Sequence, residues 1–92
     1  MKFTVYCHEI ISGSDVGLYF SASLEQSIAA AENYRSAYRI FDPAGPPLGT
    51  LAIYEMVLRM PGAAAMIDVL NSPESLLPIC LKSRRLVAES VD

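Results

Sequence analysis

The sequence has no tryptophan, one histidine and two cysteines among its 92 residues. A structural zinc site needs about four ligands at fixed spacing, and His8 with the distant Cys7 and Cys80 offers no such pattern. The motifs of phosphate-binding loops, dinucleotide-binding turns, hydrolase elbows and zinc proteases are also missing. We therefore expect neither a metal nor any other cofactor.

Charge is also scarce. Charged residues make up 18% of the chain, and ten acids against seven bases give a net charge of -3. Proteins that bind nucleic acid neutralise phosphates with an excess of lysine and arginine, so this balance argues against nucleic acid and anionic membranes as partners. No apolar run reaches the roughly 18 residues of a membrane span, and the N-terminus lacks the apolar segment of a secretory signal. We expect a cytoplasmic protein with reduced cysteines.

Apolar residues are abundant, at 52% of the chain. A chain of this length has the size of one domain and buries roughly two thirds of its surface on folding. We therefore expect a single globular domain spanning residues 1–92, with a core that needs no disulfide or metal.

The best-defined element is a helix that begins at Ser23. Residues 23–26 form a capping box, in which the serine hydroxyl and the Gln26 side chain satisfy backbone amides of the first turn. We expect this helix to end near Ser36, with one apolar and one polar side. The apolar side would hold Leu24, Ile28, Ala31 and Tyr34, and the polar side Glu25, Glu32, Asn33 and Arg35.

Alternating β-branched and aromatic residues predict a first strand over residues 2–11. The remaining pattern predicts a turn at 12–17, strands at 18–20, 38–41 and 51–60, a helix at 63–70, a helical turn at 72–77, and strand residues at 79–81 and 86–91 flanking a turn at 82–85.

This order predicts an α+β fold, with a mostly antiparallel sheet of four to five strands and two helices on one face. Two topologies fit: a ferredoxin-like βαββαβ sandwich, or a ββαββ start with the last helix and strand appended. A paired strand at 18–20 would favour the second topology, and a loop there would favour the first. The pattern fits residues 79–91 as one strand or as two.

The stretch from Tyr6 to Glu9 is the only cluster that combines nucleophile, base and acid residue types. Neighbours on a strand point to opposite faces, so Cys7 cannot act together with His8, and a cysteine in such an apolar setting is typical of a core. A single histidine is more often structural than catalytic. The catalytic candidates are His8, Tyr6 and Tyr54.

Three of the seven bases, Lys82, Arg84 and Arg85, lie within four residues. The simplest interpretation is a solvated turn. The functional interpretation is a contact for an anion, which Arg39 or Arg59 nearby would strengthen.

The sheet face without helices is expected to be apolar, carrying Tyr6, Ile10, Leu51, Ile53 and Val57. Such a face needs a cover, which a second copy or another protein would supply. Our main hypothesis is a small non-catalytic interaction or accessory domain that forms a homodimer. The alternative is a small-molecule enzyme or binder of the dimeric α+β barrel type, with a cleft around His8.

Overall fold

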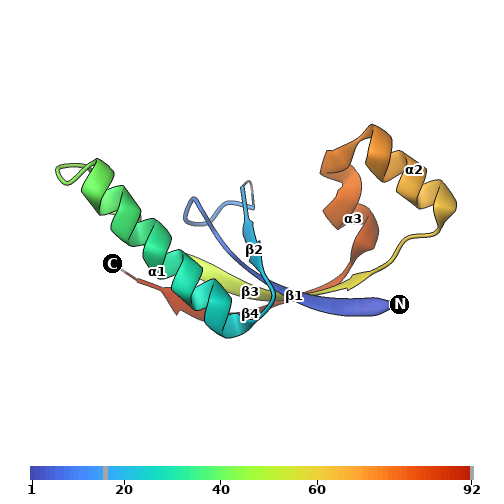
Figure 1. Ribbon diagram of the computed structural model, residues 1–92, viewed down its shortest axis with the longest axis horizontal. Helices are drawn as coiled ribbons and strands as arrows, with labels where there is room; N and C mark the ends of the chain where they lie inside the picture. The colour runs from blue at the N-terminus through green and yellow to red at the C-terminus, as the bar shows by residue number, and fades with distance from the viewer. Residues whose placement is uncertain (16, 92) are drawn as a thin grey trace.

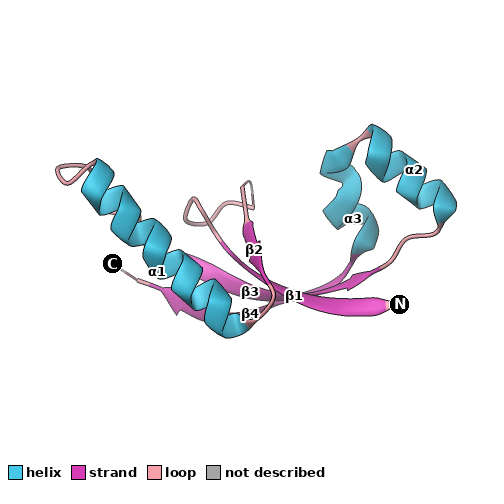
Figure 2. Cartoon of the chain, viewed as in Figure 1, coloured by secondary structure: helices cyan, strands magenta, loops and turns pink. Residues whose placement is uncertain are grey.

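The computed structural model describes residues 1–15 and 17–91. Residue 16, within the expected turn at 12–17, and residue 92, the end of the expected domain, lie outside the described residues. The elements, drawn in Figures 1 and 2, are β1 (Lys2–His8), β2 (Tyr19–Ser21), α1 (Leu24–Phe41), β3 (Leu51–Arg59), α2 (Ala63–Asn71), the 3-10 turn η1 (Pro73–Ser75), α3 (Leu76–Cys80) and β4 (Leu81–Ser90).

The four strands form one antiparallel sheet in the order β2-β1-β3-β4. The expected α+β class with an antiparallel sheet is therefore confirmed. β2 pairs with the end of β1, where Tyr19 lies opposite His8 and Ser21 opposite Tyr6. This pairing gives the chain a ββα start and excludes the ferredoxin-like order. The expected ββαββ start is met only as far as ββαβ, because one strand, β3, follows α1 before α2.

α1 begins at the predicted capping box, although Gln26 reaches the amide of Ala22, one residue before the N-cap. The Ser23 hydroxyl accepts from the Gln26 amide at 3.1 Å, and the Gln26 side chain accepts from the Ala22 amide at 3.1 Å. The expected end near Ser36 and the strand at 38–41 are wrong, because the helix continues to Phe41. A four-residue alternation is a weak signal, and no neighbouring strand is present among the described residues to pair with this segment.

α1 lies on the sheet face that holds His8, Leu51 and Ile53, which are all buried. We call this the α1 face. The expectation that it would be bare is therefore wrong. The buried side of α1 is also rotated from the expected stripe and consists of Ser27, Ala31 and Arg35. Ser27 and Ala31, four residues apart on one side of the helix, are small and let α1 approach the sheet closely.

The opposite face is covered by different segments. Its buried residues include Cys7 and Met56, and the pocket beside Met56 is lined by Leu18 from the β1–β2 connection and Leu77 from α3. Helices therefore lie on both faces, α1 on one and the short α3 on the other, instead of two on one face. Pro78 occupies the first turn of α3, where proline fits a helix.

Residues 81–90 form one continuous strand, so the expected turn at 82–85 and the expected strand at 79–81 are wrong. The pairing of β4 with β3 is irregular at two points, between Ile53 and Tyr54 and between Val57 and Leu58. β4 is an edge strand, and lysine and arginine are common there because they hinder pairing with another chain.

The molecule is elongated, with extents of 48 × 25 × 17 Å and a radius of gyration of 14.9 Å, against about 12 Å for a compact domain of this length. α2 and α3 project from the end of the sheet that is farther from the C-terminal end of α1 (Figure 1). Among the described elements, α2 contacts only η1 and α3. None of the described helices is long and apolar enough to cross a membrane.

Candidate functional site

His8 lies at the centre of the best candidate site. The side chain is 2% exposed and is held between two tyrosines, Tyr19 from β2 and Tyr34 from α1. The ring centroids are 5.5 Å from Tyr19 and 6.0 Å from Tyr34. The hairpin register brings Tyr19 opposite His8, and packing of α1 on the sheet brings Tyr34 above it.

A pocket of about 260 Å³ opens beside this histidine, lined by His8, Ile10, Tyr19, Ala30, Asn33 and Tyr34. His8 Nδ1 lies 2.9 Å from the Glu9 carbonyl oxygen. A carbonyl can only accept, so we assign the proton of the neutral ring to Nδ1, which leaves Nε2 with a lone pair. The site combines aromatic walls, one acceptor nitrogen and the amide of Asn33, a composition suited to a small, mostly apolar ligand with a hydrogen-bond donor.

The two tyrosines named from the sequence lie elsewhere. The Tyr6 hydroxyl donates to Glu55 Oε2 at 3.0 Å on the α1 face, and this hydrogen bond raises the pKa of Tyr6. Tyr54 lies on the opposite face, where the guanidinium of Arg84 stacks 4.7 Å from its ring centroid. The structure therefore does not bring Tyr6 or Tyr54 into the His8 pocket.

Glu9, the acidic neighbour of His8, is buried and serves the sheet. Its Oε1 accepts from the Ala52 amide at 2.7 Å, while its own amide donates to the Ala52 carbonyl at 3.0 Å. The carboxylate thus extends the pairing of β1 with β3 by one residue. This role occupies one oxygen of Glu9 and leaves His8 without a carboxylate as an orienting partner in the pocket lining.

Both cysteines are free and buried. Burial raises the pKa of the Cys7 thiol, and the Tyr54 backbone and the nearby Arg84 lower it by less. The thiol form is therefore favoured, which makes Cys7 a poor nucleophile. No group of three or more metal-ligating side chains is placed to hold an ion within the described ranges.

The three clustered bases do not converge. Arg84 pairs with Asp15 at 2.6 Å on the opposite face, and Arg85 pairs with Glu55 at 3.1 Å on the α1 face. Lys82 lies beside Lys2 and Arg59 at the end of the sheet. Arg84 and Arg85 diverge because successive side chains of a strand point to opposite faces, and Lys82 lies at the irregular point of the pairing between β3 and β4.

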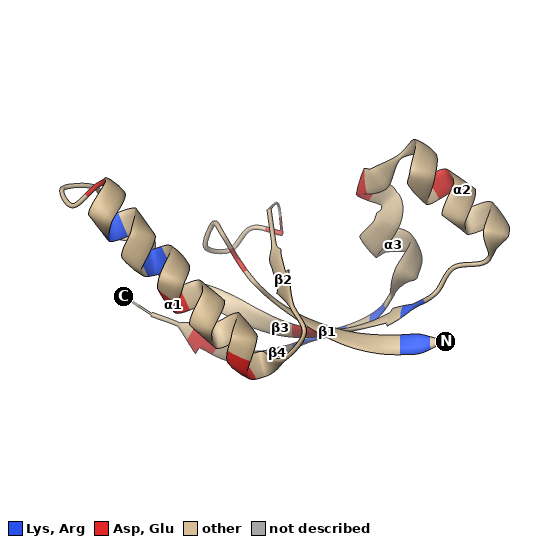
Figure 3. Cartoon of the chain, viewed as in Figure 1, with Lys and Arg blue, Asp and Glu red and all other residues tan. Residues whose placement is uncertain are grey.

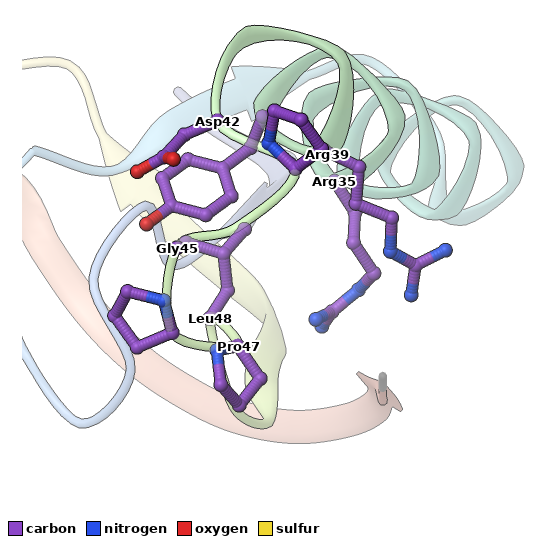
Figure 4. A pocket seen from close by; sticks show the side chains of 9 residues that line it. Arg35, Arg39, Asp42, Gly45, Pro47 and Leu48 are labelled. Atoms are coloured by element: carbon purple, nitrogen blue, oxygen red, sulfur yellow. The ribbon is translucent and has the colours of Figure 1, made fainter.

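A second pocket of about 260 Å³ lies between the C-terminal end of α1 and the connection to β3 (Figure 4). Arg35 and Arg39 line it from the helix, and Pro47 and Leu48 line it from the connection. Arg35 is buried and donates to the carbonyl oxygens of Gly49 and Ser90. Its guanidinium thus serves the fold, although the sequence pattern placed this arginine on the polar side of the helix.

No family model, curated protein or solved structure matches the chain. Its function must therefore be argued from its own surface and pockets.

Proposed function

We propose that the chain is a small cytoplasmic interaction domain without catalytic activity, and that it works as a homodimer with α2 at the interface. One observation carries the proposal: α2 is apolar almost all round, yet only its inner side is covered. Asp68 is the only charged residue among its nine, and Val69 is the only one that is buried. A helix that is apolar all round is normally buried on every side.

The uncovered side of α2 is a stripe of Ala63, Ile67 and Leu70, which we call the α2 stripe. Their spacing of four and then three residues places them on one side of the helix. Ile67 is 56% exposed and Leu70 is 72% exposed. Contact with η1 and α3 covers the other side of α2, and no described strand contacts this helix.

A second copy is the occupant that fits this stripe best. Most soluble homo-oligomers are two-fold symmetric, so the same surface must complement itself. If two copies of α2 pack antiparallel about Ile67, the small Ala63 of one copy lies opposite the partner's Leu70. Large and small side chains then interlock at both ends, with Asp68 beside the contact.

The accessible surface area of the chain also supports a homodimer. The accessible surface is 5947 Å², whereas a compact monomer of this mass exposes roughly 5,200 Å². The excess is close to the roughly 800 Å² that each partner buries in a stable interface of ordinary size. The elongated shape thus exposes about as much additional surface as one dimer contact would remove.

A charge placed in the α2 stripe tests the proposal. Leu70→Lys puts an ammonium group into the contact, and a lysine near the C-terminal end of a helix leaves the helix itself stable. We expect sedimentation equilibrium to show a mass near the single-chain 10.0 kDa for this variant. Ile40→Lys is the matched control, because Ile40 is 83% exposed near the end of α1 and lies outside the stripe.

The control variant should keep the parent's dimeric mass. Two results would overturn the proposal: a Leu70→Lys variant that remains dimeric, or an Ile40→Lys variant that dissociates to the same extent. Circular dichroism of both variants, compared with the parent, establishes that each is folded.

Binding of a small molecule around His8 is the second candidate function. The observation that favours it is the pocket between Tyr19 and Tyr34, with the Nε2 lone pair of His8 available. A fragment such as phenol, which combines an aromatic ring with one donor, is the simplest probe. Chemical-shift changes confined to the pocket residues, and absent in His8→Gln, would support this candidate. Unchanged spectra at millimolar phenol would contradict it.

A further inference from the structure

Three cations gather where β1 begins, β3 ends and β4 begins. Lys2 lies directly opposite Arg59 in the pairing of β1 with β3, so their side chains share a face. Ser83 of β4 lies opposite Val57, and Leu81 lies opposite Leu58, so Lys82 between them has no partner in the register. The ammonium group of Lys82 lies close to that of Lys2. We call Lys2, Arg59 and Lys82 the cation cluster.

No acidic residue compensates this cluster within the described part of the chain. Arg84 and Arg85 have carboxylate partners, but none of the three clustered cations forms an ion pair there. Figure 3 shows basic residues at these ends of the three strands, whereas the acidic residues of β3 and β4, Glu55 and Glu89, lie further along those strands. The proximity of Lys2 and Arg59 lowers the pKa of Lys82. Such a cluster is notable in a chain of net charge -3, because like charges in contact repel unless an anion lies among them.

A pocket of about 340 Å³ adjoins the cluster. Arg59 and Lys82 line it on one side, and Met60, Ile79 and Leu81 supply apolar wall. Met60 and Ile79 are partly exposed, so the apolar wall is accessible to a ligand. The site therefore combines cations that fit an oxyanion with a surface that fits a short hydrocarbon chain.

We propose that the cation cluster and this pocket bind a small amphiphilic anion, in which a phosphate or carboxylate group carries a short apolar chain. The oxyanion lies among Lys2, Arg59 and Lys82, and the chain lies along Met60 and Ile79. This site is separate from the α2 stripe, because the pocket meets α2 at Ala65 on its half-buried inner side. The proposal is independent of the homodimer.

Isothermal titration of the full chain with hexyl phosphate and with inorganic phosphate tests both halves of the site. We expect hexyl phosphate to bind at least tenfold more tightly, since each methylene that is buried adds up to about fourfold in affinity. We also expect affinity to fall as salt concentration rises, because exposed charges are screened. Heptanoate, with the same hexyl chain but a carboxylate, should compete for the same site.

Two variants that each remove one positive charge identify the residues that bind the anion. Lys82→Gln should weaken hexyl phosphate binding about three- to fivefold, the effect expected when one exposed ion pair is lost. Arg85→Gln removes a cation that is paired with Glu55 and should change the affinity less than twofold. Thermal unfolding of each variant establishes that it is folded.

Three results would overturn the proposal. They are the absence of heat at millimolar hexyl phosphate, equal affinities for hexyl phosphate and inorganic phosphate, and equal weakening by Arg85→Gln. The last result would mean that any positive charge on the protein surface attracts the anion, and that the cation cluster is not a specific site.

Discussion

Arg35 in α1 donates to Ser90, the last residue of β4, through two different atoms. Its Nε lies 3.2 Å from the Ser90 hydroxyl, and a terminal nitrogen lies 2.8 Å from the Ser90 carbonyl oxygen. The same terminal nitrogen donates to Gly49 just before β3 at 2.9 Å, and the Ser90 hydroxyl donates to Glu32 at 3.1 Å. One buried guanidinium thus connects the middle of α1 to both strands beneath it.

Removing this guanidinium should destabilise the fold. Arg35→Ala removes the donor to the buried Ser90 and to the half-buried Gly49 carbonyl oxygen and opens a cavity, so we expect the free energy of unfolding to fall by about 3 kcal/mol. Ser36→Ala, on the exposed side of the same helix, should change it by less than about 0.5 kcal/mol. Urea unfolding of the three proteins measures both values. Equal stability of Arg35→Ala and the parent would show that the arginine does not join the helix to the sheet.

His8 should also be needed for stability, because it is buried and packed between two aromatic rings. Truncation in His8→Ala removes that packing and should cost about 2–4 kcal/mol in the free energy of unfolding. Tyr54→Phe, on the other face of the sheet, keeps its ring and should cost less than about 1 kcal/mol. If His8→Ala loses less than about 0.5 kcal/mol by urea unfolding, the histidine is not part of the core.

The raised pKa of Cys7 predicts a loss of stability in alkaline solution. Burial disfavours the thiolate, so the folded state holds the thiol proton more tightly than the unfolded state does. Stability is therefore full below roughly 8.5, the usual thiol pKa, and falls as pH rises through the folded value. Unfolding of the parent between pH 7 and 10, compared with Cys7→Val, measures this contribution. A Cys7→Val variant with the same alkaline loss would assign the effect to other groups.

Much of the fold could be predicted because local signals were strong and agreed. The capping box fixed the start of α1, and the alternation in residues 2–11 and 51–60 identified β1 and β3 within a few residues. The side on which α1 lies could not be predicted, since β3 is apolar on both faces, with Leu51 and Ile53 on one and Met56 and Leu58 on the other. Which of two such apolar faces α1 covers depends on how the other segments pack against the sheet.

The sites were harder to predict than the elements. His8 was a candidate from its residue type, but Tyr19 joins it through the hairpin register and Tyr34 through the packing of α1. Sequence spacing alone does not supply either contact. Lys82 was also a candidate, but its neighbours Lys2 and Arg59 come from the ends of two other strands. The run of bases at 82–85 suggested a turn because charges are common in turns, although an exposed edge strand accommodates them equally well.

The mass of the parent chain in solution is the most direct test of the homodimer. Sedimentation equilibrium in reducing buffer, over a wide range of protein concentration, should give twice the single-chain mass of 10.0 kDa. That result would mean that a second copy removes exposed surface from water, as the uncovered side of α2 requires. A mass of 10.0 kDa at every concentration would contradict the homodimer and leave the α2 stripe without its proposed occupant.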